Sequence, residues 1–353
     1  MTRNLKIAAV AAGTVALGSV LGAVAAGAQR RLCLQVIRNR GGIARVQSVT
    51  APDGEEIRVL SQGGVYQSAT YLGDRRFEPV FAYYRAFDAM FEAWPGHEDG
   101  SRPIKGVRNV LMIGGGGFAY PKHLLTAHSG IHLDVAELDL SVVRVARRWF
   151  FLDELEARLA NPETARGNTL RIIEANGRAL LERGEGTAGV GADGGRGGRA
   201  GSKAGGGHVA AGRFVVDGPG GALRVLREGE ISLPRYDAIV NDAFLGREPA
   251  RELSTVEAAR AVRGRLAPGG LYLVNVVSGD GGRDLSFLRD EVATLAEVFE
   301  FVHVLQSSDA EFGGEDNYLL IATDGDAEFS EDIPYEDDFP GTSLHDDDEV
   351  TCA

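Results

Sequence analysis

The sequence has few of the residues that build disulfide-bonded or metal-binding proteins. Only two of its 353 residues are cysteine, Cys33 and Cys352, and their places at opposite ends of the chain exclude a disulfide scaffold. The seven histidines show no spacing typical of metal ligands, so no metal cofactor is expected. The chain also lacks a G-x-S-x-G nucleophile elbow and a visible Cys–His pair, which argues against hydrolase chemistry.

The chain has fewer basic than acidic residues, 37 against 50, and the excess of acid is confined to one end. Twelve acidic residues and no Lys or Arg follow residue 323, and removing them from the net charge of -13 leaves -1 for residues 1–323. We therefore predict an acidic, disordered tail over residues 324–353. The body has no basic face and no recognised nucleic-acid-binding motif, so nucleic acid is not expected as a partner.

Glycine is abundant but concentrated in one segment. Of the 29 residues from 184 to 212, 13 are Gly, and no apolar period runs through them. We predict a flexible low-complexity insertion here. A phosphate-binding role is not expected, because such a loop needs a strand before it and a helix after it.

The amino-terminal segment is the longest uncharged run. Residues 7–28 contain 22 residues without a charge, which is long enough to span a bilayer. Two basic residues precede this run and five arginines follow it by residue 45, which favours an uncleaved membrane anchor with a cytoplasmic body. The alternative is a signal peptide cleaved near Ala28, which would give a secreted protein. Residues 1–40 are assigned to this segment.

From residue 101 to 323, short apolar runs alternate with stretches of helical spacing. Residues 141–159 have the spacing of one helix. The pattern predicts an α/β fold with a Rossmann-like, mostly parallel seven-stranded sheet covered on both faces. The expected strands are near residues 109–113, 131–138, 170–175, 236–240, 271–277, 301–305 and 318–322.

Residues 41–100 have a different pattern. Short β-rich stretches there are separated by the turn signal Pro52-Asp53-Gly54. This pattern predicts a small antiparallel β appendage and a linker in front of the main domain.

Ligands of open α/β sheets bind beyond the carboxyl ends of the strands, so the residues just after each strand are candidates for a site. Glycines after the first strand allow a ligand to approach the backbone closely. Glu137, which ends the second strand, is placed to accept hydrogen bonds from ribose hydroxyls. Asp242 ends the fourth strand and is the candidate catalytic acid or base. The predicted nucleoside-binding residues are Gly114, Gly115, Gly116, Gly117, Glu137, Asn176 and Gly177.

Each of these candidates also has a purely structural interpretation. The glycines serve equally as a tight turn, and the Asn176-Gly177 pair is a strong turn former. Asp139 competes with Glu137, although Asp139 suits the cap of the following helix better. Asp242 would otherwise cap the loop that follows it.

Together these stretches resemble the spermidine synthase family of polyamine aminopropyltransferases. The similar segments are residues 63–69, 110–116, 136–139, 176–177, 236–242 and 266–270. The resemblance implies a small β-domain followed by a methyltransferase-like Rossmann domain. It also implies that decarboxylated S-adenosylmethionine donates an aminopropyl group to a small-molecule amine. By family position, Gln67 and Tyr71 would lie in the substrate region, and a homodimer is a further expectation.

The chain departs from the family at positions that carry the chemistry. Gly117 stands where the family has the Asp that holds the aminopropyl amine, and Leu245 replaces the second acid of the active-site loop. The acid expected before Gly177 is Asn176. Two alternatives therefore stay open: a methyltransferase that uses S-adenosylmethionine, and a non-catalytic, membrane-anchored binding protein on the same fold.

Overall fold

In a computed structural model of the chain, the described residues are 32–39, 42–51, 54–92, 106–183, 214–217, 223–226, 232–246, 248–278, 284–307 and 317–348. The predicted membrane segment at residues 7–28 and the glycine-rich insertion at 184–212 lie outside these ranges and stay predictions. Within the described ranges, no helix combines the length and the apolar character that crossing a membrane requires.

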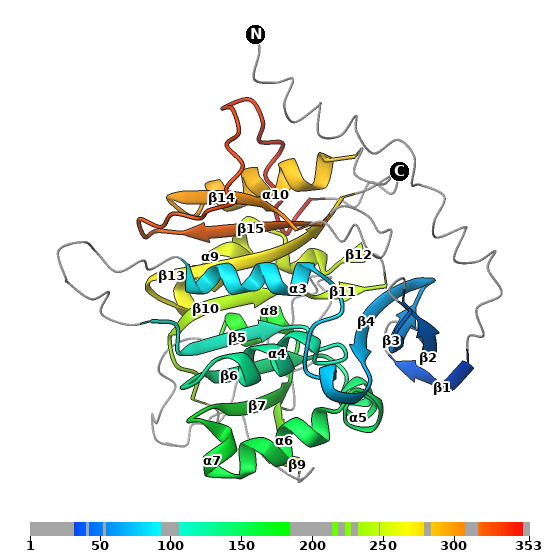
Figure 1. The fold of residues 1–353 in the computed structure, drawn as a ribbon. Coiled ribbons are helices and arrows are strands. Elements are labelled where there is room, and N and C mark those ends of the chain that lie inside the picture. The colour runs from blue at the N-terminus through cyan, green and yellow to red at the C-terminus, as the bar shows by residue number, and fades with distance from the viewer. Residues whose placement is uncertain are drawn as a thin grey trace, which may run out of the picture.

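The appendage is a four-stranded antiparallel sheet in which each strand pairs with the next (Figure 1). Its strands are β1 (Leu32–Asn39), β2 (Gly42–Thr50), β3 (Glu56–Gln62) and β4 (Val65–Tyr71). Alternate side chains such as Ala44, Val46, Ile57 and Val59 are buried, as in a sheet with one covered face. The predicted boundary at residue 40 is wrong by one strand, because β1 pairs with β2 and so belongs to the appendage.

The main sheet has nine strands in the order β14-β15-β13-β10-β5-β6-β7-β8-β9 (Figure 1). Strands β13, β10, β5, β6 and β7 pair in parallel, whereas β15 is antiparallel to β13 and β14. These seven strands confirm the predicted sheet, and the hairpin of β8 and β9 extends it beside β7. The strands are β5 (Asn109–Ile113), β6 (His132–Glu137), β7 (Thr169–Glu174), β8 (Phe214–Asp217), β9 (Leu223–Leu226), β10 (Tyr236–Asn241), β13 (Leu266–Val277), β14 (Phe301–Gln306) and β15 (Asn317–Thr323).

Helices cover both faces of this sheet (Figure 1). In β5, Val110 and Met112 join the apolar cluster of the appendage and helices α4 to α6, whereas Leu111 and Ile113 join the cluster of α8 to α10. Burial on both faces explains the continuous apolar run in the sequence. The helices are η1 (Gly73–Arg75), α3 (Tyr83–Ala86), η2 (Phe87–Phe91), α4 (Ala119–Ala127), α5 (Leu140–Trp149), α6 (Leu152–Ala160), α7 (Pro162–Ala165), α8 (Gly177–Leu181), η3 (Arg251–Leu253), α9 (Val256–Arg265) and α10 (Ser286–Ala296).

The single helix predicted over residues 141–159 is two helices, α5 and α6. Phe151 between them has a left-handed backbone (φ 61°), which ends the first helix and starts the second at a new angle. Phe150 is fully buried at this break. Tertiary packing of an aromatic side chain thus overrides the helical spacing of the sequence.

The acidic tail is not disordered over residues 324–348, and that prediction is wrong for this part of the chain. The main-chain N–H of Ile333 donates to Val304, and that of Gly341 donates to Arg289 on α10. Phe329 is buried in the main apolar cluster. The tail is ordered because its few apolar residues pack on the sheet and arginines of the body receive its acids and carbonyl groups.

A buried lysine joins the appendage to the main domain. Lys122 on α4 has no exposed surface, and its Nζ donates to Thr70 Oγ1 (2.8 Å), the carbonyl of Arg76 (2.9 Å) and the carbonyl of Phe150 (2.8 Å). Burial lowers the pKa of Lys122 to about 7. Three acceptors match the three N–H groups of the ammonium form, so the geometry favours the charged state. Lys122 therefore holds the end of β4 against the break between α5 and α6.

We expect Lys122→Met to lower the free energy of unfolding by on the order of 2–4 kcal/mol, because three buried acceptors lose their donor. Urea denaturation measures this change. Arg144→Met, at an exposed position of α5, removes the same charge and serves as the control. Equal stability of the two variants would contradict the role given to Lys122.

Candidate functional site

The carboxyl ends of β5 and β10 approach each other closely at the centre of the sheet. These strands are parallel neighbours, and the N–H of Asp242 donates to the carbonyl of Ile113 (3.0 Å). Gly114 has φ +94°, and a Cβ there would lie 2.5 Å from the carbonyl oxygen of Asp242. Only glycine fits this position. The structure thus brings the predicted glycine loop and the predicted catalytic acid side by side.

Glu137 lies at the end of β6 and binds the glycine loop directly. Its Oε2 accepts hydrogen bonds from the N–H groups of Gly115 (3.0 Å) and Gly116 (3.3 Å), and its Oε1 accepts one from Asp139 (3.0 Å). Burial raises the pKa of Glu137, and these three N–H groups oppose that rise. The carboxylate thereby fixes the loop's shape, and its role toward a ribose stays a prediction.

Asp139 has the capping role that the sequence suggested. Its Oδ1 accepts from the N–H of Ser141 (2.8 Å) at the start of α5. Asp139 thus caps α5, and the choice of Glu137 over Asp139 for a ribose stays a prediction.

The space next to Gly117 is filled by other side chains. A Cβ at Gly117 would lie 2.6 Å from Ser68 Oγ and 2.9 Å from the ring of Phe150. Both neighbours are fully buried, so neither has room to move away. No larger side chain fits at this position, including the Asp that the resemblance leads one to expect.

Polar side chains from two segments contact the carboxyl group of Asp242. Asn275 Nδ2 on β13 donates to Oδ1 (2.8 Å), and the hydroxyl of Tyr83 on α3 lies 3.4 Å from Oδ2. Asn317 at the start of β15 in turn donates to Asn275 Oδ1 (3.2 Å). Although Asp242 keeps part of its surface exposed, burial of the carboxyl raises its pKa to about 7, against the opposing effect of Asn275 and Tyr83.

Tyr83, Tyr84 and Asn275 belong to this site and were missed in the sequence. The rings of Tyr83 and Tyr84 lie 4.1 Å apart, and burial together with the nearby Asp242 charge raises the pKa of both hydroxyls. Asn275 lies inside the predicted strand at residues 271–277, so the rule that selected residues just after each strand passed over it. No local signal marks the two tyrosines, because only the tertiary fold brings α3 to this edge.

Gln67 lies at the site, whereas Tyr71 has a different setting. Gln67 Nε2 donates to the carbonyl of Gly246 (2.8 Å), in the loop between β11 (Phe244–Leu245) and β12 (Glu248–Pro249). Tyr71 is 3% exposed in the main apolar cluster, and the guanidinium of Arg75 lies 3.8 Å from its ring centroid. Tyr71 thus packs in the core, and a contact between it and a substrate stays a prediction.

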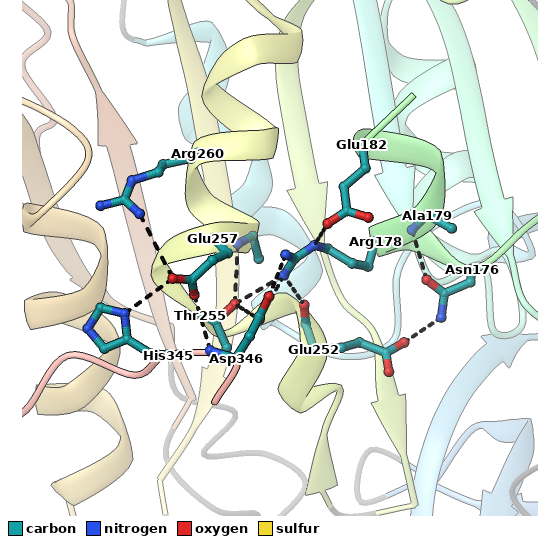
Figure 2. A network of polar contacts seen from close by, with 11 residues as sticks. Asn176, Arg178, Ala179, Glu182, Glu252, Thr255, Glu257, Arg260, His345 and Asp346 are labelled. Atoms are coloured by element: carbon teal, nitrogen blue, oxygen red, sulfur yellow. Dashed lines mark hydrogen bonds and ion pairs between the residues drawn. The ribbon is translucent and has the colours of Figure 1, made fainter. Parts of the chain in front are cut away.

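Asn176 and Gly177 have structural roles at the start of α8. Asn176 Oδ1 accepts from the N–H of Ala179 (3.0 Å), and its Nδ2 donates to Glu252 Oε1 (Figure 2). A Cβ at Gly177 would lie 2.4 Å from Ile113 Cγ2, so glycine lets α8 pack against the end of β5. Asn176 is therefore the N-cap of α8 and not part of an Asn-Gly turn, and a contact with adenine stays a prediction.

The fold defines a class: a Rossmann-like α/β domain preceded by a small antiparallel β-domain. No model of a known protein family matches the sequence, and no curated protein matches it either. Solved structures do match the fold. A probable spermidine synthase from Corynebacterium glutamicum is 19% identical with a TM-score of 0.51, covering 83% of this chain and 80% of that one.

A second similar structure is a spermidine synthase in complex with AdoDATO, described as a transition-state analogue. It is 15% identical with a TM-score of 0.51, and the match covers 83% of this chain and 74% of that chain. The fold expected from the resemblance to spermidine synthases is thereby confirmed.

We expect Gly114→Ala to reduce the free energy of unfolding by about 2–4 kcal/mol, because the new Cβ would collide with the Asp242 backbone. Gly64→Ala is the matched control: Gly64 has φ +85° and nothing within 4 Å of the added Cβ. The control should lose only about 1 kcal/mol from backbone strain. Chemical denaturation of both variants measures the difference. An equal loss of unfolding free energy would mean that backbone strain at positive φ explains the whole effect and that the collision contributes nothing.

The pKa of Asp242 predicts how stability depends on pH. The folded-state pKa of about 7 lies above the ordinary 3.8, so the folded chain binds the proton more tightly. The stability this adds is complete below about pH 4 and is lost as pH rises through about 7. We expect the free energy of unfolding of wild type to fall by about 2–3 kcal/mol between about pH 5 and pH 8. Asp242→Asn should not show this decrease. Denaturation at both pH values tests this, and parallel curves for wild type and variant would contradict it.

Proposed function

We propose that this protein is a transferase that binds an S-adenosyl donor at the carboxyl edge of the sheet and passes a group to a small nucleophile. The observation that carries the proposal is the enclosed carboxyl of Asp242, beside the glycine loop and between Asn275 and Tyr83. The similar structure that holds AdoDATO supports an S-adenosyl-type ligand. In this proposal Glu137 and the glycine loop receive the nucleoside.

Asp242 is suited to act as a general base. A carboxyl with a pKa of about 7 is largely ionised just above neutral pH and still accepts a proton readily. The nucleophile's lone pair attacks the carbon next to the donor's sulfonium, and the carbon–sulfur bond breaks with its electrons passing to sulfur. A neutral thioether leaves, and the proton released by the nucleophile passes to Asp242. The protein's main contributions are orientation and exclusion of water.

Aminopropyl transfer to a polyamine is the first candidate, and it rests on the resemblance and the shared fold. The crowding at Gly117 favours methyl transfer as a second candidate. Ser68 and Phe150 leave no room for an acid that would hold the amine of an aminopropyl donor. A methyl donor keeps its carboxylate, which accepts hydrogen bonds from the backbone N–H groups of a glycine loop without any side chain.

Calorimetry on the full chain separates the candidates. S-adenosylmethionine, its decarboxylated form and methylthioadenosine are titrated in turn. Preference for the decarboxylated form, with methylthioadenosine released when putrescine is added, supports aminopropyl transfer. Preference for S-adenosylmethionine supports methyl transfer. Binding without transfer to any amine supports a binding protein, and binding of none of the three overturns the proposal.

We expect Asp242→Asn to reduce turnover by about 10²–10⁴-fold with little change in donor affinity, because the base is lost while the nucleoside contacts remain. The control is Glu248→Gln, which removes an exposed acid from the same loop. Steady-state rates together with donor titration measure both quantities. Unchanged turnover in Asp242→Asn would exclude this residue as the base.

A further inference from the structure

The last described part of the chain packs along α10 and against the start of α9. Residues 341–348, named here the clasp, cross α10 and end at α9. The N–H of Leu344 donates to Thr294 Oγ1 (2.9 Å), and its carbonyl accepts from the N–H of Val256 (2.8 Å). The clasp therefore bonds on one side to α10 and on the other to the first turn of α9.

Asp346 is the centre of the clasp (Figure 2). Its Oδ2 accepts from Arg178 Nη2 (2.8 Å), and its Oδ1 accepts from Arg178 Nη1 (3.2 Å) and Thr255 Oγ1 (2.7 Å). A bidentate arginine–carboxylate pair is stronger and more directional than a simple ion pair. Burial raises the pKa of Asp346, but hydrogen bonds from Arg178 and Thr255 outweigh this effect and lower the pKa overall, so Asp346 is charged at neutral pH.

Arg178 connects the clasp to two segments, α8 and residues 252–255. It lies on α8 directly after Gly177, and its side chain is 14% exposed. Nη1 also donates to the carbonyl of Glu252 (3.1 Å), while the Glu252 side chain accepts from Asn176 (Figure 2). A single guanidinium therefore holds α8 and residues 252–255 in one arrangement.

Residues 251–255 are the exit of the loop that begins at Asp242. Within that loop, the N–H of Ala250 donates to the carbonyl of Ala243 (2.9 Å), and the N–H of Leu253 donates to Ala250 (2.8 Å). Arg251 Nη2 donates to the carbonyl of Asp348, which adds a second tie to the clasp. One side-chain hydrogen bond and a series of main-chain hydrogen bonds thus connect the clasp to Ala243, the residue after Asp242.

We propose that the clasp positions the nucleoside side of the site, with Asp346 acting through Arg178 on α8 and on the loop exit. This inference rests on the proposed function only for its ligand, because the effect on α8 and the loop exit is independent of any ligand. Asp346 and Arg178 are positioning residues and touch no substrate in this proposal. Removal of the Asp346 charge should loosen α8 and residues 251–255 and weaken donor binding, while the core stays intact.

The test compares Asp346→Asn with Asp347→Asn in the full chain. Asp347 lies in the same clasp and loses the same charge, but it contributes no side-chain contact described for this network. We expect amide hydrogen exchange in Asp346→Asn to speed up about tenfold at residues 177–181 and 251–255, with β5 and β6 unchanged. Asp347→Asn should match wild type.

Kinetics supply a second readout that general destabilisation would not give. For the donor that wild type binds, KM should rise about three- to tenfold in Asp346→Asn with kcat changed less than twofold. Asp346→Glu, which keeps a carboxylate, should restore most of the affinity. Exchange and KM equal to wild type in Asp346→Asn would overturn the clasp and leave the proposed function standing. Faster exchange in a protein that binds no donor would support the clasp and overturn the proposed function.

Discussion

The close approach of β5 and β10 at their carboxyl ends is the constraint on which the site depends. A Cβ at Gly114 would lie 2.5 Å from the Asp242 carbonyl, so the two strand ends meet only because position 114 has no side chain. The next two glycines then turn their N–H groups to Glu137 on the neighbouring strand. The loop and both carboxylates are therefore fixed by one backbone geometry before any ligand arrives, which is the preorganisation that binding and catalysis require.

The site combines this geometry with very little buried charge. Asp242 is surrounded by neutral donors, Asn275 and Tyr83, and burial raises its pKa to about 7. A site for a multiply charged amine needs several carboxylates, since an unpaired buried ammonium is costly. Leu245, at the second acid position of the resemblance, is 54% exposed, and Ser68 and Phe150 fill the space beside Gly117. The fold, which is similar to that of solved spermidine synthases, thus surrounds a site that has no acid at positions 117 and 245.

Near the carboxyl terminus, acidic side chains pair with arginines of the body. Twelve acids in the last thirty residues suggest self-repulsion, yet arginines of the body receive several of them: Asp346 pairs with Arg178, and Asp324 pairs with Arg263. Exposed pairs contribute little by themselves. The tail also buries Phe329 and donates main-chain hydrogen bonds to β14 and α10. Charge pairing and this packing together hold it beside α8 and α9.

The sequence by itself determined the order of strands and helices, the β appendage and the residues at the carboxyl edge, because apolar periodicity and glycine after a strand are local properties. Gly114, Glu137 and Asp242 followed from them, whereas Gln67 was expected only from the family resemblance. Only the tertiary structure decided that Tyr83 reaches Asp242, that Lys122 joins the two parts, that one helix breaks at Phe151 and that the tail packs. Each of these depends on contacts between residues distant in the chain. Neither composition nor periodicity shows which distant residue will form a hydrogen bond with a buried polar group or an ion pair with an acid of the tail.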